Sequence, residues 1–523
     1  MNRAKLFVVT LLLLGAPVLH AQQARPDLVV FISVDQLRGD YLDRFESGLS
    51  GGLLRLKRDG AYFVNAFQDH AVTVTAVGHA TMLSGRFPRS TGIISNNLGV
   101  PDPQARSIEG TASASPFRFR GSTLIDWMRV TDPLSRALSV SVKDRGAILP
   151  LGRAKQQAFW YSSGGSFTTS NYYADTLPDW VKGFNALKLP EKYAGRVWRP
   201  LRNPSAYPEP DSGKALAAGQ RSVFPHALPT DAKQAVRQLS AFPWIDEINL
   251  QFALAGLDAL KLGKNGHIDL LAVSLSATDA IGHEYGPDSR ELHDQILRLD
   301  LALGAFLDSV YKRFPPEKVV VALTADHGVT SFPESVAADS ARAAALRVDL
   351  KPVADKIRVH LKEHGYPANA LVLEGGLVMF SPALMQNLAL RDSVAHMIAT
   401  EVRKVRGVER VDFVRELPRG DTINDAVTRR WLHALPPDVP VPLVITLKDM
   451  HIFGATRSAT HGSPRDRDAH VPIIFFGPQF KAGRYPQFAR TVDIAPTLAR
   501  VISVLPTEPL DGRALTSALK EQW

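Results

Sequence analysis

The sequence contains no cysteine among its 523 residues. This absence excludes disulfide bonds, thiolate zinc sites and cysteine nucleophiles, so any catalysis must use oxygen and imidazole groups. Neither sign of charge dominates, because 61 lysines and arginines are offset by 52 aspartates and glutamates. The chain also lacks a basic stripe of the kind that binds nucleic acid, so we expect no nucleic-acid partner. The 45% of hydrophobic residues suffices for a large core.

Long apolar runs are missing except at the N-terminus, where LFVVTLLLLGAPVL follows the basic stretch MNRAK. The run is short for a bilayer span, and the small residue Ala21 ends the segment. We therefore expect residues 1–21 to be a cleaved signal peptide and the mature protein to be periplasmic or secreted. An uncleaved anchor is the alternative, whereas a lipid anchor is excluded because no cysteine follows. Loss of Arg3 and Lys5 lowers the formal charge from +9 to +7.

Short apolar runs that predict buried strands occur along the remaining chain. Three of them lead to an acidic residue: LVVFISV (28–34) to Asp35, IDLLAVSLS (268–276) to Asp279, and KVVVALT (318–324) to Asp326. Two later runs, VPLVITL (441–447) and VPIIFFG (471–477), look similar. Such continuous apolar strands are typical of a parallel sheet that helices cover on both faces.

Amphipathic helices are predicted between these strands. Apolar residues recur at spacings of three and four over 289–313, and 247–262 has the same period. The alternation predicts an α/β fold with a mostly parallel central sheet. Ligands bind beyond the carboxyl ends of the strands in such sheets, so Asp35, Asp279 and Asp326 indicate a site.

Two stretches depart from the alternation. Residues 152–240 are rich in Pro, Ser, Tyr and Trp, and predict a loop-rich insertion that caps the site. Residues 335–435 combine a helical pattern at 338–364 with strand-like segments near 370–380 and 407–414. We expect this second insertion to form a small α+β subdomain.

Histidines and carboxylates gather in three motifs. TDAIGH places Asp279 and His283 four residues apart, TADHGV places Asp326 beside His327, and ATHGS contains His461. Each motif alone is compatible with hydrogen-bonded structural residues. Together they supply oxygen and nitrogen ligands without thiolate, which suits zinc, and they predict a metal site.

The other histidines lack such neighbours. His79 would face away from residue 75 if a helix starts there, and His470 would support entry to the strand at 471–477. We interpret both as structural. The same interpretation applies to His360, His364, His396, His433 and His451.

The segment TVTAVGHATMLSG (73–85) predicts a strand that turns into a helix near Ala76. Thr75 would then be the N-cap, a position that threonine favours for structural reasons. The same position lets helix amides bind an anion, and a hydroxyl there beside a metal ion is a stronger nucleophile. Both interpretations stay open, and position favours Thr75 over Thr73 and Thr81.

A cationic pair, Lys143 and Arg145, stands at a predicted strand end in LSVSVKDRGAILP, so both side chains can point to one side. They are either exposed edge cations or a clamp for a phosphoryl group, to which arginine offers a planar fork. Asn96, in GIISNNLG, could add a side-chain donor from a loop.

Taken in order, these motifs resemble those of the alkaline phosphatase superfamily. The match is best with its threonine-nucleophile branch of phosphate-irrepressible alkaline phosphatases, which neighbours the nucleotide pyrophosphatase/phosphodiesterases. It runs from VVFISVDQLRGDYL to DGRAL, and implies an alkaline-phosphatase-like catalytic domain over 22–523 with two zinc ions. The matching ligands are Asp35, Thr75, Asp326 and His327 for one ion, and Asp279, His283 and His461 for the other.

The resemblance also implies roles. Thr75 matches the nucleophile that becomes transiently phosphorylated, while Asn96, Lys143 and Arg145 match residues that hold the non-bridging phosphate oxygens. We therefore expect an exported, monomeric phosphatase that hydrolyses small phosphate monoesters.

Three other functions are compatible with parts of this pattern. A phosphodiesterase or nucleotide pyrophosphatase has the same fold, but two cations suit the extra negative charge of a monoester. A sulfatase is disfavoured because it needs a cysteine or serine where Thr75 stands. A binding module that keeps its metals as scaffold would not need Thr75 at all.

Overall fold

The computed structural model describes residues 25–110, 113–209, 223–333, 346–454 and 459–521. Its main body is a nine-stranded sheet with the order β18-β2-β17-β10-β1-β9-β4-β5-β6. In chain order the strands are β1 (Leu28–Val34), β2 (Ala61–Phe63), β4 (Ala137–Ser141), β5 (Gln157–Tyr161), β6 (Phe167–Thr168), β9 (Asp269–Leu275), β10 (Val319–Thr324), β17 (Ile473–Phe476) and β18 (Gly483–Tyr485). The five neighbours from β10 to β5 pair in parallel, which confirms the expected mostly parallel sheet.

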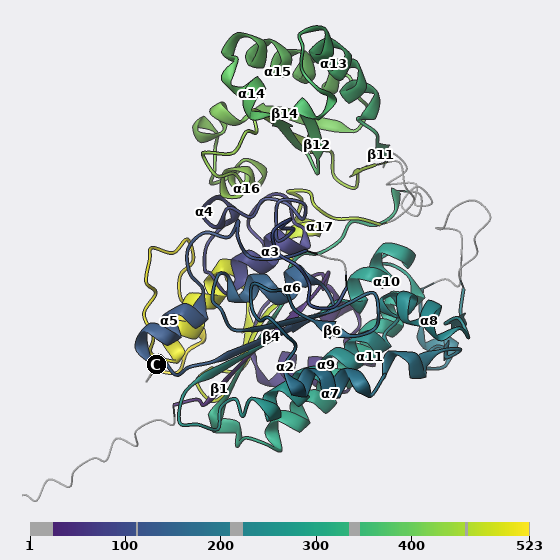
Figure 1. Ribbon diagram of the computed structural model, residues 1–523, viewed down its shortest axis with the longest axis vertical. Coiled ribbons are helices and arrows are strands. Elements are labelled where there is room, and N and C mark those ends of the chain that lie inside the picture. Colours follow the sequence, from purple (N-terminus) through teal and green to yellow (C-terminus); the bar gives the residue numbers. More distant parts are fainter. Residues whose placement is uncertain (1–24, 111–112, 210–222, 334–345, 455–458, 522–523) are drawn as a thin grey trace, which may run out of the picture.

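Helices cover both faces of this sheet (Figure 1). Successive side chains of β1 point to opposite faces, so Val30 and Ile32 pack with α2, α9 and α11, whereas Val29 and Phe31 pack with α5 and α18. The predicted helices over 247–262 and 289–313 are confirmed as α9 and α11. The helices of the main body include α1 (Tyr41–Arg44), α2 (Gly52–Asp59), α3 (Thr75–Met82), α4 (Pro88–Thr91), α5 (Leu124–Thr131), α6 (Asp144–Ile148), α7 (Asp179–Ala186), α8 (Ala232–Gln238), α9 (Trp244–Ala259), α10 (Ala277–Tyr285), α11 (Arg290–Tyr311), α17 (Asp466–Ala469) and α18 (Ile494–Val501).

The two late apolar runs differ from the expected parallel strands. VPIIFFG forms β17 in the central sheet, but β17 is antiparallel to both β10 and β2. VPLVITL forms β15 (Leu443–Leu447), which lies in a separate antiparallel sheet. An apolar run predicts only that a strand is buried on both faces. Both the nine-stranded and the four-stranded sheet bury a strand in this way, so the pattern does not distinguish them.

The range 152–240 contributes to both the sheet and the surface around it. Its first strands, β5 and β6, belong to the central sheet, because the apolar run at 158–160 pairs with β4. After these strands come α7, the two-stranded ribbon of β7 (Val197–Trp198) and β8 (His226–Ala227), and α8.

A small subdomain is built on a four-stranded antiparallel sheet of order β12-β13-β15-β14. Its elements are β12 (Leu371–Glu374), β13 (Leu377–Phe380), β14 (Val408–Phe413) and β15, with α13 (Lys351–Glu363), α14 (Pro382–Gln386), α15 (Leu388–Val402) and α16 (Ala426–Ala434). Helices α13 and α15 share an apolar core with the sheet, and α16 lies between the subdomain and the main body (Figure 1). The sheet takes β15 from beyond residue 435, so its last strand lies outside the range that the sequence marked for this subdomain.

The expected signal peptide, residues 1–21, lies outside the described residues, as does the first part of the helical pattern at 338–364. Among the residues that the structure describes, no helix combines the length and the apolar character needed to cross a bilayer.

Candidate active site and metal centre

Three neighbouring parallel strands deliver acidic residues to one edge of the central sheet. Asp35 directly follows β1, Asp326 lies two residues after β10, and Asp279 lies in the first turn of α10, which follows β9. All three carboxylates are buried. The carboxyl ends of parallel strands share an edge, so the predicted convergence of these acids is confirmed.

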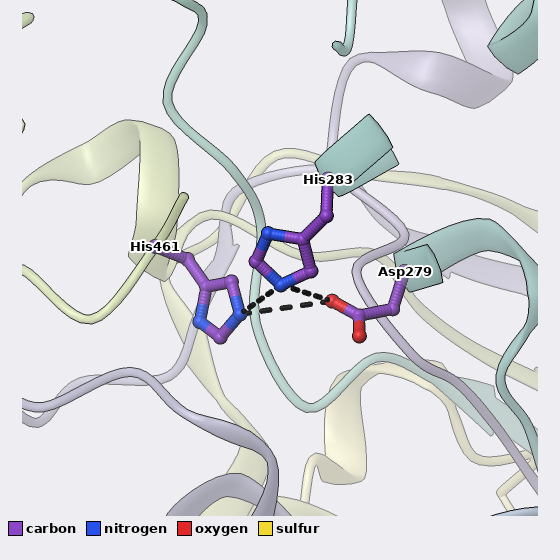
Figure 2. Close-up of side chains that lie close together, drawn as sticks. All are labelled: Asp279, His283 and His461. Atoms are coloured by element: carbon purple, nitrogen blue, oxygen red, sulfur yellow. Dashed lines mark hydrogen bonds and ion pairs between the residues drawn. The ribbon is translucent and has the colours of Figure 1, made fainter. Parts of the chain in front are cut away.

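Asp279, His283 and His461 form one group whose ligand atoms converge (Figure 2). Oδ1 of Asp279 lies 3.2 Å from Nε2 of His283 and 3.6 Å from Nε2 of His461. The two histidine Nε2 atoms are 3.2 Å apart. Each ring is oriented from its other side, because Nδ1 donates to a backbone carbonyl, that of Ala459 for His283 and that of Thr73 for His461.

A second group joins Asp35, Asp279 and His327, so Asp279 belongs to both. Nε2 of His327 lies 3.4 Å from Oδ1 of Asp35 and 3.6 Å from Oδ2 of Asp326. The family resemblance implies Asp326, and not Asp279, as a ligand beside Asp35 and His327. In the structure Asp326 is the neighbour of this group through its contact with His327.

These donor atoms fit a metal ion. Nδ1 of His327 is near only an acceptor, the carbonyl of Gly328, so in the neutral ring Nε2 carries the lone pair. That lone pair faces Oδ1 of Asp35, and neither atom has a hydrogen-bond partner although both residues are fully buried. Two electron-rich buried atoms face each other favourably only with a cation between them, and oxygen and imidazole ligands suit a divalent ion such as zinc.

Lys143 is the cation that the chain itself supplies to this cluster. Its Nζ donates to Oδ2 of Asp35 and, at 2.6 Å, to Oδ2 of Asp279. Burial raises the pKa of Asp35, and the charges of Asp279 and Asp326 raise it further. Burial opposes ionisation of Asp279 too, but Lys143 and His283 hold its pKa well below the ordinary value. The carboxylates compete for too little positive charge, which a bound cation would relieve.

The pKa values of His461 and His283 shift in opposite directions, for different reasons. Burial lowers the pKa of His461, and the neighbouring His327 and His283 lower it further. For His283 the effect of burial is outweighed by Asp279, which raises its pKa. A neutral His461 is the form that can act as a metal ligand.

Thr75 begins α3, whose start differs slightly from the expectation. The N-cap is Val74 and Thr75 is the first helical residue, because Val74 keeps the extended backbone. The side chain of Asn96 performs the capping, since its Oδ1 accepts the N–H of Ala76 at 2.9 Å. Gly78 lets α3 approach the metal-binding loop, because a Cβ at this position would overlap the carbonyl oxygen of Asp326.

Lys143 and Arg145 lie on a helix start rather than on a strand end. Strand β4 ends at Ser141, Lys143 is the N-cap of α6, and Arg145 lies in the first turn of that helix. The Nε of Arg145 is buried without a hydrogen-bond partner, while its Nη1 lies 3.6 Å from Asp144. The guanidinium therefore keeps donor capacity for an anion.

The sequence predicts that His79 faces away from Thr75, and this prediction is wrong. Its Nδ1 donates to the carbonyl of Thr75 at 2.9 Å and lies 3.3 Å from Oδ2 of Asp326, while its Nε2 lies 2.8 Å from Oγ of Ser274. Residues four apart share one face of a helix, so the spacing of Thr75 and His79 was the available signal. His470 is as expected, because its Nε2 donates to the carbonyl of Val64 beside the start of β17.

Comparisons with known proteins agree with this geometry. The family model of type I phosphodiesterase/nucleotide pyrophosphatase matches residues 29–429. The chain is 30% identical to alkaline phosphatase PhoV of Synechococcus elongatus over 518 residues, covering 95% of this chain and 94% of the relative. It is 28% identical to alkaline phosphatase PafA of Elizabethkingia meningoseptica, covering 95% of each chain.

Solved structures give the same result at the level of fold. The crystal structure of wild-type alkaline phosphatase PafA superposes with a TM-score of 0.87 at 28% identity, covering 95% of this chain and 99% of that one. Murine ectonucleotide pyrophosphatase/phosphodiesterase 5 shares the fold at a TM-score of 0.52 and 14% identity, covering 94% of this chain and 100% of that one. The chain therefore belongs to the type I phosphodiesterase/nucleotide pyrophosphatase family of the alkaline phosphatase superfamily.

Proposed function

We infer that the protein is an alkaline phosphatase, a metal-dependent hydrolase of phosphate monoesters. The observation that carries this inference is the cluster of three buried carboxylates and three histidines, which lies beside the N-terminus of α3 and in which Lys143 bridges Asp35 and Asp279. The relatives named as alkaline phosphatases over almost their whole length support it. We propose further that the cofactor is a pair of zinc ions and that Thr75 is the nucleophile.

Each proposed ligand set has a defined chemistry. Two zinc ions, one at Asp35, Thr75, Asp326 and His327 and the other at Asp279, His283 and His461, would supply Lewis-acid stabilisation of the attacking and leaving oxygens. His79 holds the carbonyl of Thr75 and so fixes the first turn of α3.

The chain's own residues carry the remaining steps. The hydroxyl oxygen of Thr75 loses its proton to solvent and bonds to phosphorus as the P–O bond of the ester breaks; the leaving oxygen takes a proton from water and departs as the alcohol. Water then attacks the phosphothreonine, and the bond between phosphorus and Thr75 breaks to give inorganic phosphate and the free hydroxyl. Lys143, Arg145 and the positive N-terminal end of α3 offset the charge on the three non-bridging oxygens. Asn96 contributes its Nδ2, because its Oδ1 is engaged by the helix.

A phosphodiesterase on the same fold is the alternative, because the matched family includes such enzymes. A diester places a substituent on one of the oxygens that Lys143 and Arg145 would contact, and it carries one negative charge less. Two cations at this place therefore favour a monoester.

A comparison of p-nitrophenyl phosphate with bis-p-nitrophenyl phosphate tests the choice. We expect a higher kcat/KM for the monoester, and we expect the double variant Lys143→Ala/Arg145→Ala to lose about 10²- to 10³-fold on the monoester and much less on the diester. The matched control is Arg153→Ala/Lys155→Ala, which removes two exposed cations at the same spacing. A clear preference of the wild-type enzyme for the diester would reverse the assignment.

We also propose that residues 1–21 are a cleaved signal peptide and that the mature enzyme, 22–523, is a periplasmic or secreted monomer. The catalytic domain would carry the cap within 152–240 and the small subdomain within 335–435, extended by β15. N-terminal sequencing of the exported protein and its mass by light scattering check these points.

A further inference from the structure

Gln36 is a fully buried residue that directly follows Asp35 at the end of β1. Its φ of 67° places the backbone in the left-handed region, which glutamine rarely adopts. This turn aims the backbone N–H at Oδ1 of Asp326 (3.1 Å) and the side-chain Nε2 at Oδ1 of Asp279 (2.6 Å). Gln36 thus links the acidic residues from all three strand ends.

The residue is costly in the folded state. Its Oε1 is buried without a hydrogen-bond partner. The same atom lies against Gly282 of α10, where a Cβ would overlap it. An unsatisfied buried acceptor and a left-handed non-glycine backbone each destabilise the folded state. An apolar side chain would avoid the first cost, so packing does not explain the amide.

The amide has a definite partner, because the two oxygens of Asp279 are divided between two donors. Oδ2 accepts from Lys143, and Oδ1 accepts from Gln36. The same Oδ1 lies 3.2 Å from Nε2 of His283, and that of His461 is 3.6 Å away. The rotation of the carboxylate is therefore fixed with Oδ1 towards both histidines.

We propose that Gln36 is a positioning residue for Asp279, which holds Oδ1 in place for a metal ion at the His283–His461 site. This inference rests on the proposed function. When Lys143 contacts a phosphoryl group instead of Asp279, the amide of Gln36 keeps the carboxylate oriented. The residue acts through Asp279 and does not itself contact the substrate.

The test is the variant Gln36→Met, which has a similar shape but no donor, followed by zinc titration of the metal-free protein against a chromophoric chelator. Removing a hydrogen-bond partner of a metal ligand typically weakens metal binding about 10- to 100-fold. We expect a loss of that size for the zinc ion at His283 and His461 and a smaller loss for the other, because Asp279 belongs to both ligand groups. We also expect the thermal stability of the metal-free variant to equal or exceed that of the wild type, which a purely structural role would not allow.

The matched control is Gln295→Met. Gln295 is another buried glutamine whose Oε1 lacks a partner, but its Nε2 donates to Asp246 and Thr278, which are not proposed ligands. We expect wild-type zinc affinity and lower stability. Equal zinc affinities of wild type and Gln36→Met would overturn the inference, whereas a wild-type protein that binds no zinc would instead overturn the proposed metal centre.

A second variant serves if Gln36→Met does not fold. Gly282→Ala leaves Gln36 in place but inserts a methyl group where its Oε1 lies, and so displaces the amide from Asp279. We expect the same selective loss of zinc affinity. Unchanged affinity in this variant would likewise refute the positioning role.

Discussion

The edge of the central sheet that holds the site and the small four-stranded sheet bury opposite kinds of side chain. At the edge, Asp35 and His327 are fully buried with ligand atoms that lack hydrogen-bond partners. The small sheet buries aliphatic side chains against α13 and α15, and charges on these two helices pair near the surface, as Lys356 does with Glu401. Buried apolar area stabilises a fold, whereas uncompensated buried charge destabilises it. The edge therefore keeps its charges for binding and catalysis, and the small sheet serves stability.

The largest effect is expected from Thr75→Ala, which breaks the chemistry of the edge without disturbing its charges. We expect phosphatase activity to fall at least roughly 10³-fold, because the substitution removes the hydroxyl of the proposed nucleophile. Zinc content by metal analysis should stay near that of the wild type. The control is Thr81→Ala in the same helix, whose hydroxyl donates to the carbonyl of Gly78. It should lose stability and keep activity, and undiminished phosphate release by Thr75→Ala would exclude this nucleophile.

A core substitution in the small sheet should show the reverse pattern. Leu443, in β15, is fully buried in the subdomain core. Leu443→Ala should lower the free energy of unfolding by about 2–5 kcal/mol, because it leaves a cavity. Urea unfolding measures this loss, and kcat for p-nitrophenyl phosphate should stay within about twofold at a temperature where the variant is folded. A large fall in kcat at unchanged stability would mean that this sheet takes part in catalysis.

The smallest effect concerns how the stability of the protein depends on pH through Asp246, which lies next to the start of α10. Asp246, on α9, accepts the N–H groups of Ser276 and Ala277 at the start of α10, and burial raises its pKa to about 6. Between pH 4 and 6 the folded state then binds more protons than the unfolded state, so stability falls as pH rises and stays lower above pH 6.

Asp246→Asn removes this titration and keeps an acceptor for the two N–H groups. Relative to the wild type, we expect the variant to gain about 2 kcal/mol between pH 4 and 7. Urea unfolding of chelator-treated protein at several pH values measures the gain. Parallel pH profiles of the two proteins would show that Asp246 is not the responsible carboxyl.

Much of the fold followed from patterns along the chain. The parallel strands were predicted from continuous apolar runs, and the helices α9 and α11 from apolar residues that recur every three or four positions. An apolar run does not show which strand it pairs with or in which direction. The sheet of β15 and the direction of β17 were therefore predicted wrongly. The start of α3 shifted by one residue, and Lys143 and Arg145 moved to α6, because a boundary depends on local capping geometry.

The site divides in the same way. Residue types and spacing predicted the acidic residues and histidines that converge at the sheet edge, whereas the role of Thr75 stays a prediction. Gln36 and His79 were not identified, because their roles depend on contacts with Asp279 and Asp326, more than 240 positions away.

The sequence by itself determined the ligand chemistry: without cysteine, a metal centre here must use carboxylate and imidazole. It also determined which strands lead to an acid. Only the tertiary structure decided that Asp279 belongs to both ligand groups, that Lys143 bridges it to Asp35, and that Gln36 fixes its orientation. The reason is physical, because strand neighbours and side-chain directions follow from packing the whole sheet, whereas a residue type is local.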